Sequence, residues 1–138
     1  MSESATTTVR IKVRHYELDT LGHLNHAVYH QYGEVARLEW LDEMGGAGGG
    51  LRHAKLAPVL LESRIRFRRE LRAGDVVDVT CVATFGDGRT FRMDNEIRKV
   101  DGTVSAEINS TVGLMDLVRR KLVDDPRGEF VRAGLKID

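Results

Sequence analysis

Four runs of alternating apolar and polar residues follow Pro58, and they constrain the fold of this chain more than any other feature of the sequence. Glycine-containing turns separate the runs, which are Val59–Leu71, Val76–Phe85, Thr90–Val100 and Val104–Met115. A period of two is typical of strands with one buried face. In the first run the pattern predicts an inward face made of Val59, Leu61, Ser63, Ile65 and Phe67. Because the turns are short, we expect the strands to pair antiparallel.

One amphipathic helix precedes these runs. Between residues 28 and 40, apolar side chains recur at spacings of three and four, which predicts a helix with one broad apolar face. Asn25 is a suitable N-cap and Gly45 a suitable stop signal, so we expect the helix from about residue 26 to residue 44. Gly33 in its middle costs about 1 kcal/mol relative to alanine. Close approach of the helix to a sheet would explain this glycine.

A fifth alternating run, residues 9–15, lies before the helix, so the predicted order is strand, helix, four strands, an α+β arrangement. With 138 residues the chain is long enough for one hydrophobic core and short for two. We therefore expect a flexible N-terminus at residues 1–8, one domain at 9–118, and a C-terminal extension of that domain at 119–138. One helix cannot cover so wide a sheet, which favours association between subunits.

Composition excludes several classes of function. The chain has 21 Lys+Arg and 21 Asp+Glu, and this balance gives no global electrostatic reason to bind nucleic acid or an anionic membrane. We expect neither partner, and any anion site must be local. No apolar run approaches the length of a membrane span, and the N-terminus has no basic, apolar leader. A cytoplasmic location follows by default. The single Cys81 lies in a strand pattern and is interpreted as a small core residue.

Three histidines, His23, His26 and His30, have spacings that could share one helix face and bind a metal ion. We reject this reading because His23 precedes the helix and no cysteine or second carboxylate has a matching spacing. We expect neither a metal ion nor any other cofactor.

The stretch YELDTLGHLNHAVYHQYGEVARLEWL resembles the signature of hotdog-fold acyl-thioesterases of the 4-hydroxybenzoyl-CoA thioesterase type. The positions that fall in step without a gap are Asp19, Gly22, His26, Ala27, Tyr29, Glu34, Ala36 and Arg37. The order of elements, the RAGD turn and the GDGRTFRMDNEIRKVDG hairpin also match, so the likeness extends from Val9 to about Asp116. The resemblance implies a hotdog fold, in which a five-stranded antiparallel sheet wraps around one long central helix, and a homodimer or a homotetramer of two dimers.

The resemblance also implies a thioesterase that acts on an acyl thioester of coenzyme A or acyl carrier protein. Asp19 would attack the thioester carbonyl or take a proton from water, and the sequence leaves both routes open. The N-terminus of the helix would polarise the carbonyl oxygen, with the Asn25 amide as the favoured donor. His26 would orient the substrate or Asp19.

Five further residues are expected to contact substrate. The family pattern places Gly22 in the turn, and Tyr29, on the apolar stripe of the helix, is expected to be core or a wall of the pocket rather than a catalyst. Ser63 and Asn95 are each a lone polar residue on the predicted inward face of a strand, where an unpaired polar group costs about 1 to 3 kcal/mol, so each is expected to meet water, the helix or substrate. Most of the five arginines between Arg64 and Arg72 read as a solvated strand face, but one or two of them, or Arg89 at a hairpin corner, could pair with the phosphates of coenzyme A or of a phosphopantetheine arm.

Other readings compete with these. Asp19 could simply cap the turn around Gly22, and His26 could simply be solvated. At the level of function, the alternatives are a hotdog dehydratase or hydratase of 3-hydroxyacyl thioesters and a non-catalytic module that binds acyl thioesters. The motif D-x-N-P-x-H that is typical of the dehydratases is absent.

Overall fold

The computed structural model describes residues 2–3, 6–45 and 49–137. Its helical elements are the 3-10 helix η1 (His15–Glu17) and the α-helices α1 (His26–Glu43), α2 (Gly50–His53) and α3 (Pro126–Arg132). Its strands are β1 (Ser2–Glu3), β2 (Thr7–Lys12), β3 (Leu56–Phe67), β4 (Val76–Phe85), β5 (Thr90–Lys99), β6 (Val104–Asp116) and β7 (Lys121–Leu122). No helix within the described ranges is long and apolar enough to cross a lipid bilayer.

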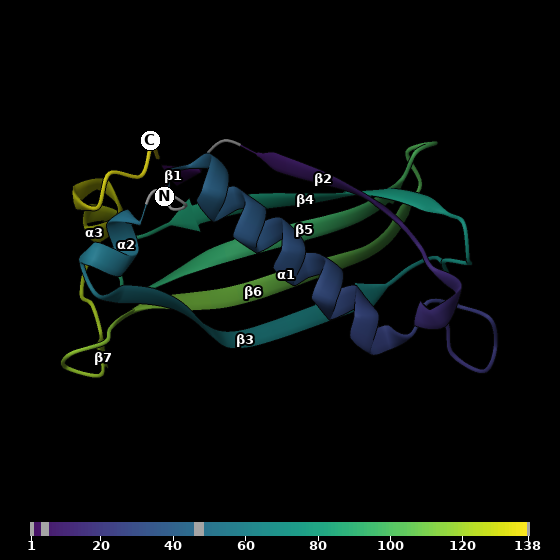
Figure 1. The fold of residues 1–138 in the computed structure, drawn as a ribbon, viewed down its shortest axis with the longest axis horizontal. Coiled ribbons are helices and arrows are strands. Elements are labelled where there is room, and N and C mark those ends of the chain that lie inside the picture. The colour runs from purple at the N-terminus through teal and green to yellow at the C-terminus, as the bar shows by residue number, and fades with distance from the viewer. Residues whose placement is uncertain (1, 4–5, 46–48, 138) are drawn as a thin grey trace.

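The predicted helix is α1, and it lies diagonally across one face of the sheet (Figure 1). It begins where its sequence predicts, because the Asn25 side chain accepts a hydrogen bond from the Ala27 N–H and so acts as the N-cap. Its buried residues are Tyr29, Tyr32, Gly33, Ala36 and Trp40. These residues share one face of the helix, which is the face that contacts the sheet.

The sheet is antiparallel, and within the described residues its order is β1-β4-β5-β6-β3, with β2 also paired to β4 and β7 to β6. The five predicted strands are β2 to β6, while β1 and β7 contain only two residues each. The curved sheet wraps around α1 (Figure 1), so the predicted α+β hotdog fold is confirmed. The first long strand begins at Thr7, two residues earlier than the sequence pattern indicated, and Thr7 is buried.

The predicted inward face of β3 is wrong for Val59 and Leu61. Leu60 pairs with Val112 and Glu62 with Thr111, so Leu61 is an extra residue in a β-bulge. A bulge inverts the alternation of side chains, and the residues on the two sides of it follow opposite phases. Leu60 therefore faces the helix side before the bulge, and Ser63 faces it after the bulge, opposite the buried Ser110.

An aromatic cluster closes the end of the core that lies far from the N-terminus of α1. The ring of Phe130, in α3, is fully buried. Its centroid lies 6.3 Å from that of Trp40, 5.8 Å from that of Phe85 and 5.4 Å from that of Phe91. Helix α3 thus seals this end of the sheet. Cys81 is also buried in the core, and burial raises the pKa of its thiol to about 12. That pKa and position fit a core residue better than a reactive thiol.

Helix α1 approaches the sheet closely at Gly33. A Cβ atom at this position would lie 2.9 Å from Ile108 Cδ1 and 3.0 Å from Asn95 Oδ1. Both atoms belong to buried side chains of the sheet, so a larger residue could not fit unless these side chains or the helix shift. The proximity that the sequence predicts for Gly33 is confirmed.

We expect Gly33→Val to lower the free energy of unfolding by about 1 to 3 kcal/mol, because overpacking pushes α1 away from Ile108. Gln31→Val, on the exposed face of the same helix, introduces the same side chain without the clash; it loses a little helix propensity, whereas Gly33→Val gains some, so the propensity difference cannot account for a larger loss at Gly33. Urea unfolding of the two variants measures the difference. Equal losses in the two variants would contradict the close approach.

Candidate active site

The site begins in the loop between η1 and α1, which folds back on itself at Asp19. The Asp19 N–H donates to the His23 carbonyl oxygen (2.8 Å), and the Gly22 N–H donates to the Asp19 carbonyl oxygen (3.1 Å). Gly22 has φ +82°, a conformation that residues with a Cβ rarely adopt. Gly22 therefore shapes the turn that presents Asp19. It is itself exposed and lies outside the pocket lining described below.

The Asp19 carboxylate has two chemically different oxygen atoms in this turn. Oδ1 accepts hydrogen bonds from the backbone N–H groups of Leu21 (2.9 Å) and His23 (3.1 Å). No residue that the structure describes hydrogen-bonds to Oδ2. The bond from His23 is the main reason that the pKa of Asp19 lies below its ordinary value, and the charges of His23 and His26 act in the same direction. Asp19 is thus both a turn-forming residue and an ionised carboxylate with one oxygen available.

The N-terminus of α1 lies next to this loop, and most of its backbone donors have acceptors. The Asn25 N–H donates to the Glu17 carbonyl oxygen (3.0 Å), so the donor that the sequence analysis favoured is already engaged. The Ala27 N–H donates to the Asn25 side chain (2.9 Å), and the Val28 N–H to the Asn25 carbonyl oxygen (2.9 Å). Among the described contacts, the His26 N–H is the donor of this turn that has no acceptor. It lies at the positive end of the helix dipole.

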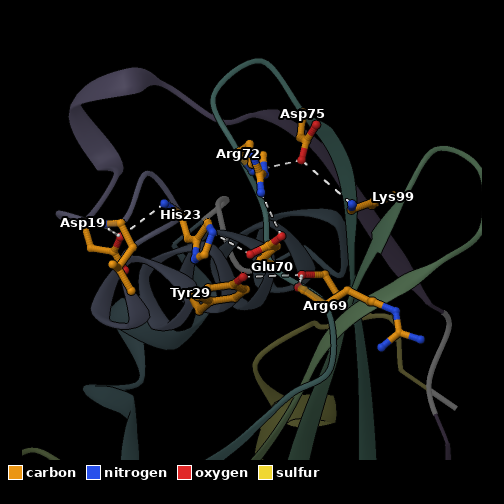
Figure 2. A network of polar contacts seen from close by, with 10 residues as sticks. Asp19, His23, Tyr29, Arg69, Glu70, Arg72, Asp75 and Lys99 are labelled. Carbon is orange, nitrogen blue, oxygen red and sulfur yellow. Dashed lines mark hydrogen bonds and ion pairs between the residues drawn. The ribbon is translucent and has the colours of Figure 1, made fainter.

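A pocket of about 310 Å³ brings Asp19, His26 and Tyr29 together. The rest of its lining comes from His23 and Leu24 of the loop and from Phe67, Arg68, Arg69 and Glu70 at the end of β3. Tyr29 is buried and forms a wall, with its ring 5.0 Å from Phe67 and its hydroxyl 3.5 Å from Ser105 Oγ. Burial raises the pKa of Tyr29, so its hydroxyl stays protonated. Of these side chains, Figure 2 labels Asp19, His23, Tyr29, Arg69 and Glu70.

Two of the predicted substrate residues, Ser63 and Arg89, lie outside this pocket. Ser63 lies in the seam between β3 and α1, where its Oγ is 3.4 Å from His30 Nδ1 and accepts a hydrogen bond from Ser110 Oγ (3.3 Å). Arg89 lies beyond the end of β4, whereas the pocket lies near the start of that strand. Its Nε is 3.0 Å from Asp124, in the groove beside α3. Within one chain, therefore, Arg89 is distant from Asp19.

Asn95 lies in the middle of the sheet, below Gly33 of α1. Its side-chain amide donates to the Thr80 carbonyl oxygen (2.8 Å), and its Oδ1 is a buried oxygen without a hydrogen-bond partner among the described residues. Arg37 reaches the same place, since its Nη1 would lie 3.4 Å from a Cβ placed on Gly33. Burial lowers the pKa of Arg37, which shows that its guanidinium is partly withdrawn from water. This polar spot is a feature of the helix–sheet contact rather than of the pocket at Asp19.

In the second half of the pocket, the sequence analysis included Arg68 and Arg69 only as members of an arginine run that could supply one or two residues to the pocket mouth, and it missed Glu70. Glu70, Arg68 and Arg69 follow β3 directly, and His23 Nε2 lies 2.5 Å from Glu70 Oε2. Nothing in the spacing of these residues indicates the contact, because Glu70 stands in an arginine-rich run far from His23 in the sequence. Among the described residues, no group of three or more histidine, cysteine, aspartate or glutamate side chains could hold a metal ion.

The chain matches the family model of the thioesterase-like superfamily over residues 13–135. In Arabidopsis thaliana, the chloroplastic acyl-acyl carrier protein thioesterase ATL3 is 37% identical over 67 residues, which are 49% of this chain and 35% of that relative. A second plant relative, ATL2, is 36% identical over 66 residues and is also covered over 35% of its length. The aligned region is thus about a third of the length of these relatives.

Solved structures share the whole architecture. The probable thioesterase YbaW of Escherichia coli is 25% identical with a TM-score of 0.83, over 94% of this chain and 99% of that chain. A 1,4-dihydroxy-2-naphthoyl-CoA thioesterase of Synechocystis, 21% identical, has a TM-score of 0.79 over 94% and 95% of the two chains, a likeness that concerns the fold alone. Since the family model covers most of the sequence and the fold agrees throughout, this chain belongs to the thioesterase-like superfamily.

Proposed function

We propose that the protein hydrolyses acyl thioesters of coenzyme A or of acyl carrier protein, with Asp19 as the reacting carboxylate. The observation that carries the proposal is that one pocket contains an ionised carboxylate oxygen with no partner among the described residues and a helix N-terminus with an N–H that has no acceptor. Membership of the thioesterase-like superfamily and the names of the two plant relatives support it.

These two groups match the two requirements of thioester hydrolysis. The carbonyl carbon needs a nucleophile or an activated water molecule, and Asp19 Oδ2 is the candidate for either role. The carbonyl oxygen needs a hydrogen-bond donor where negative charge develops, and the His26 N–H supplies one at the positive end of an 18-residue helix. The thiolate leaves readily, so the pocket needs no strong acid.

The electrostatics of Asp19 favour direct attack over general-base catalysis. A base is most effective when its pKa lies near the working pH, whereas the hydrogen bonds to Oδ1 move the pKa of Asp19 in the opposite direction. A nucleophile only has to be ionised. In direct attack, Oδ2 forms a bond to the carbonyl carbon, the thiolate departs, and water hydrolyses the mixed anhydride to restore the carboxylate.

The substrate is proposed to reach the pocket past Arg68 and Arg69. Both arginines line the pocket, and their side chains are exposed. Coenzyme A and a phosphopantetheine arm both carry phosphate, which guanidinium groups bind well. Arg68 also pairs with Glu107, while Arg69 donates to the Arg68 carbonyl oxygen (3.0 Å), so the charge of Arg69 has no carboxylate partner among the described ion pairs.

Asp19→Asn keeps an acceptor oxygen for the turn and removes the charge, so we expect it to fold and to lose about 10³-fold or more in kcat. Thiol release from a panel of acyl-CoAs and acyl-carrier proteins, followed with a thiol-reactive dye, measures the loss. Asp116→Asn is a matched control, because Asp116 Oδ1 also accepts two backbone N–H groups, from Val118 (2.9 Å) and Arg119 (3.0 Å).

We expect Asp116→Asn to retain the activity of the unaltered protein. Equal activity of the Asp19 and Asp116 variants would overturn the role of Asp19. If the unaltered protein cleaves no thioester of either class, the pocket belongs to a module that binds without turnover.

The lowered pKa of Asp19 also predicts the pH dependence of kcat/KM. Asp19 reacts as the carboxylate, so its contribution falls only as the pH drops through a pKa that lies below 3.8. We expect kcat/KM to stay level from about pH 7 to about pH 5 in short assays. A fall between about pH 7 and 6 would instead contradict a reacting carboxylate whose pKa is lowered.

A homodimer is proposed to form along β3. Beyond β3 the described chain adds no further strand, and a strand of 12 residues is a long edge to leave open. Leu60 and Leu61 on this edge are 52% and 48% exposed, and Val35 and Leu38 expose apolar surface on α1. A second copy that pairs its β3 antiparallel would satisfy the backbone and cover these side chains. Two such dimers would give the homotetramer.

We expect Leu60→Lys to convert the dimer to a monomer, because it places a charge in the covered surface. Val100→Lys is the control, since Val100 is 62% exposed and lies beyond the end of β5, away from the β3 edge. Sedimentation equilibrium distinguishes the 15.4 kDa chain from its multiples. A monomeric unaltered protein, or a dimer that survives Leu60→Lys, would contradict this interface.

A further inference from the structure

A histidine–carboxylate pair ties the Asp19 loop to the end of β3. His23 Nε2 lies 2.5 Å from Glu70 Oε2, and the two side chains are 30% and 47% exposed. Both residues line the same pocket as Asp19, and Figure 2 shows the pair between the loop and the chain segment that follows β3. The contact therefore joins two parts of the pocket that are distant in the sequence.

His23 in turn holds Asp19 through two main-chain hydrogen bonds. Its N–H donates to Asp19 Oδ1 (3.1 Å), and its carbonyl oxygen accepts from the Asp19 N–H (2.8 Å). The next residue, Leu24, donates its N–H to the Leu71 carbonyl oxygen (2.7 Å). The loop is thus attached to the segment after β3 at two consecutive residues, by a backbone bond at Leu24 and by the side chain at His23.

Glu70 is supported from its other side by cations. Arg72 Nη2 donates to Glu70 Oε1 (3.1 Å), and the Arg72 N–H donates to Asp75 Oδ2 (2.9 Å). The hydrogen bond from Arg72 is the main reason that the pKa of Glu70 is lowered, and the charges of His23 and Lys99 add to it. Glu70 therefore remains an acceptor for His23 throughout the neutral pH range, which places the ring proton on Nε2.

We propose that Glu70 is a positioning residue, which acts through His23 to hold the Asp19 carboxylate in its reactive orientation at the N-terminus of α1. The inference rests on the proposed role of Asp19 in hydrolysis. Without Glu70, the His23 side chain loses its anchor, and the two hydrogen bonds between His23 and Asp19 are left to the loop alone. A shift of about 1 Å in a reacting group can cost about 10²-fold in rate.

The pocket contains other charges that a test has to keep constant. The ionisable groups that face the pair are Asp19, His26 and Tyr29 from the loop and α1, Arg68, Arg69, Arg72 and Asp75 from the segment after β3, and Lys99 from β5. Removing Glu70 changes their electrostatic field as well as the position of the loop. Glu70→Gln separates these effects, because the amide oxygen can still accept from His23 without the charge.

The experiment measures kcat and KM for His23→Ala, Glu70→Ala, the double variant and Glu70→Gln, with Glu39→Ala on the exposed face of α1 as the control. We expect Glu70→Ala to lower kcat by about 10-fold to 10²-fold with KM changed by less than about 3-fold. The double variant should lose no more than the more damaged single variant, because the two residues act as one unit. Glu70→Gln should recover part of the loss.

A spectroscopic measurement tests the contact independently of activity. In ¹⁵N-histidine-labelled protein, the His23 ring signals should report a proton held on Nε2 and should change in Glu70→Ala but not in Glu39→Ala. An unchanged His23 spectrum in Glu70→Ala overturns the contact between His23 and Glu70, whatever the enzyme assays give. Wild-type kcat in Glu70→Ala, or additive losses of kcat in the double variant, overturns the proposed role of Glu70 as a positioning residue. Full activity in Asp19→Asn would instead remove the proposed function, and the positioning role with it, while the ring signals would still report the contact.

Discussion

The contact between α1 and the concave face of the sheet at Gly33 sets the geometry on which the rest of the structure depends. With hydrogen in place of a side chain, the helix axis approaches Ile108 and Asn95 more closely than any other residue would allow. This approach fixes the depth and direction of α1, and its first turn then emerges beside the ends of the strands. The position of the His26 N–H, and of the pocket in front of it, follows from a packing contact that lies two turns further along the helix.

The loop before α1 combines stability and reactivity in one side chain. Asp19 Oδ1 satisfies the N–H groups of Leu21 and His23, which gives the turn its shape. Asp19 Oδ1 therefore caps the turn, as one of the two interpretations of the sequence expected. This role does not compete with the proposed role of Oδ2 as the reacting oxygen. A carboxylate is well suited to such a division because its two oxygens together offer about four lone-pair directions. The same hydrogen bonds that order the loop also keep the carboxyl group ionised.

The sequence predicted the periodic parts of the fold well, because burial imposes a repeat that can be read along the chain. It placed the start of α1 at His26 and identified β2 to β6, of which β4 and β5 show a regular alternation of buried side chains. It missed the bulge in β3 because Leu60 and Leu61 are both leucine, so the pattern there fits either phase. The start of β2 was also missed, since Thr7 is buried without being apolar.

Within the candidate site, the sequence indicated the residues that belong to one continuous segment, and it did not indicate those that meet through tertiary structure. Asp19, His26 and Tyr29 come from adjacent turns of chain, so a local motif can carry them together into one pocket. The engagement of the Asn25 N–H by the Glu17 carbonyl oxygen depends on how η1 folds back, which no periodicity reveals. Glu70 is harder still, because an arginine-rich strand end normally reads as a solvated surface. Its partner becomes evident only when the loop and the end of β3 are seen side by side.

The distribution of charge shows why a neutral chain can still present a local site for an anion. On the outer face of the sheet, arginines are matched to carboxylates, as in the pairs Arg10–Asp78 and Arg92–Asp94. These exposed pairs contribute little to stability and cancel one another at a distance. Beside the pocket the match is less complete, because Glu70 is shared between His23 and Arg72. Arg69 lines the pocket, is exposed and has no carboxylate partner among the described ion pairs, so its charge is not compensated in the way that the charges on the outer face of the sheet are.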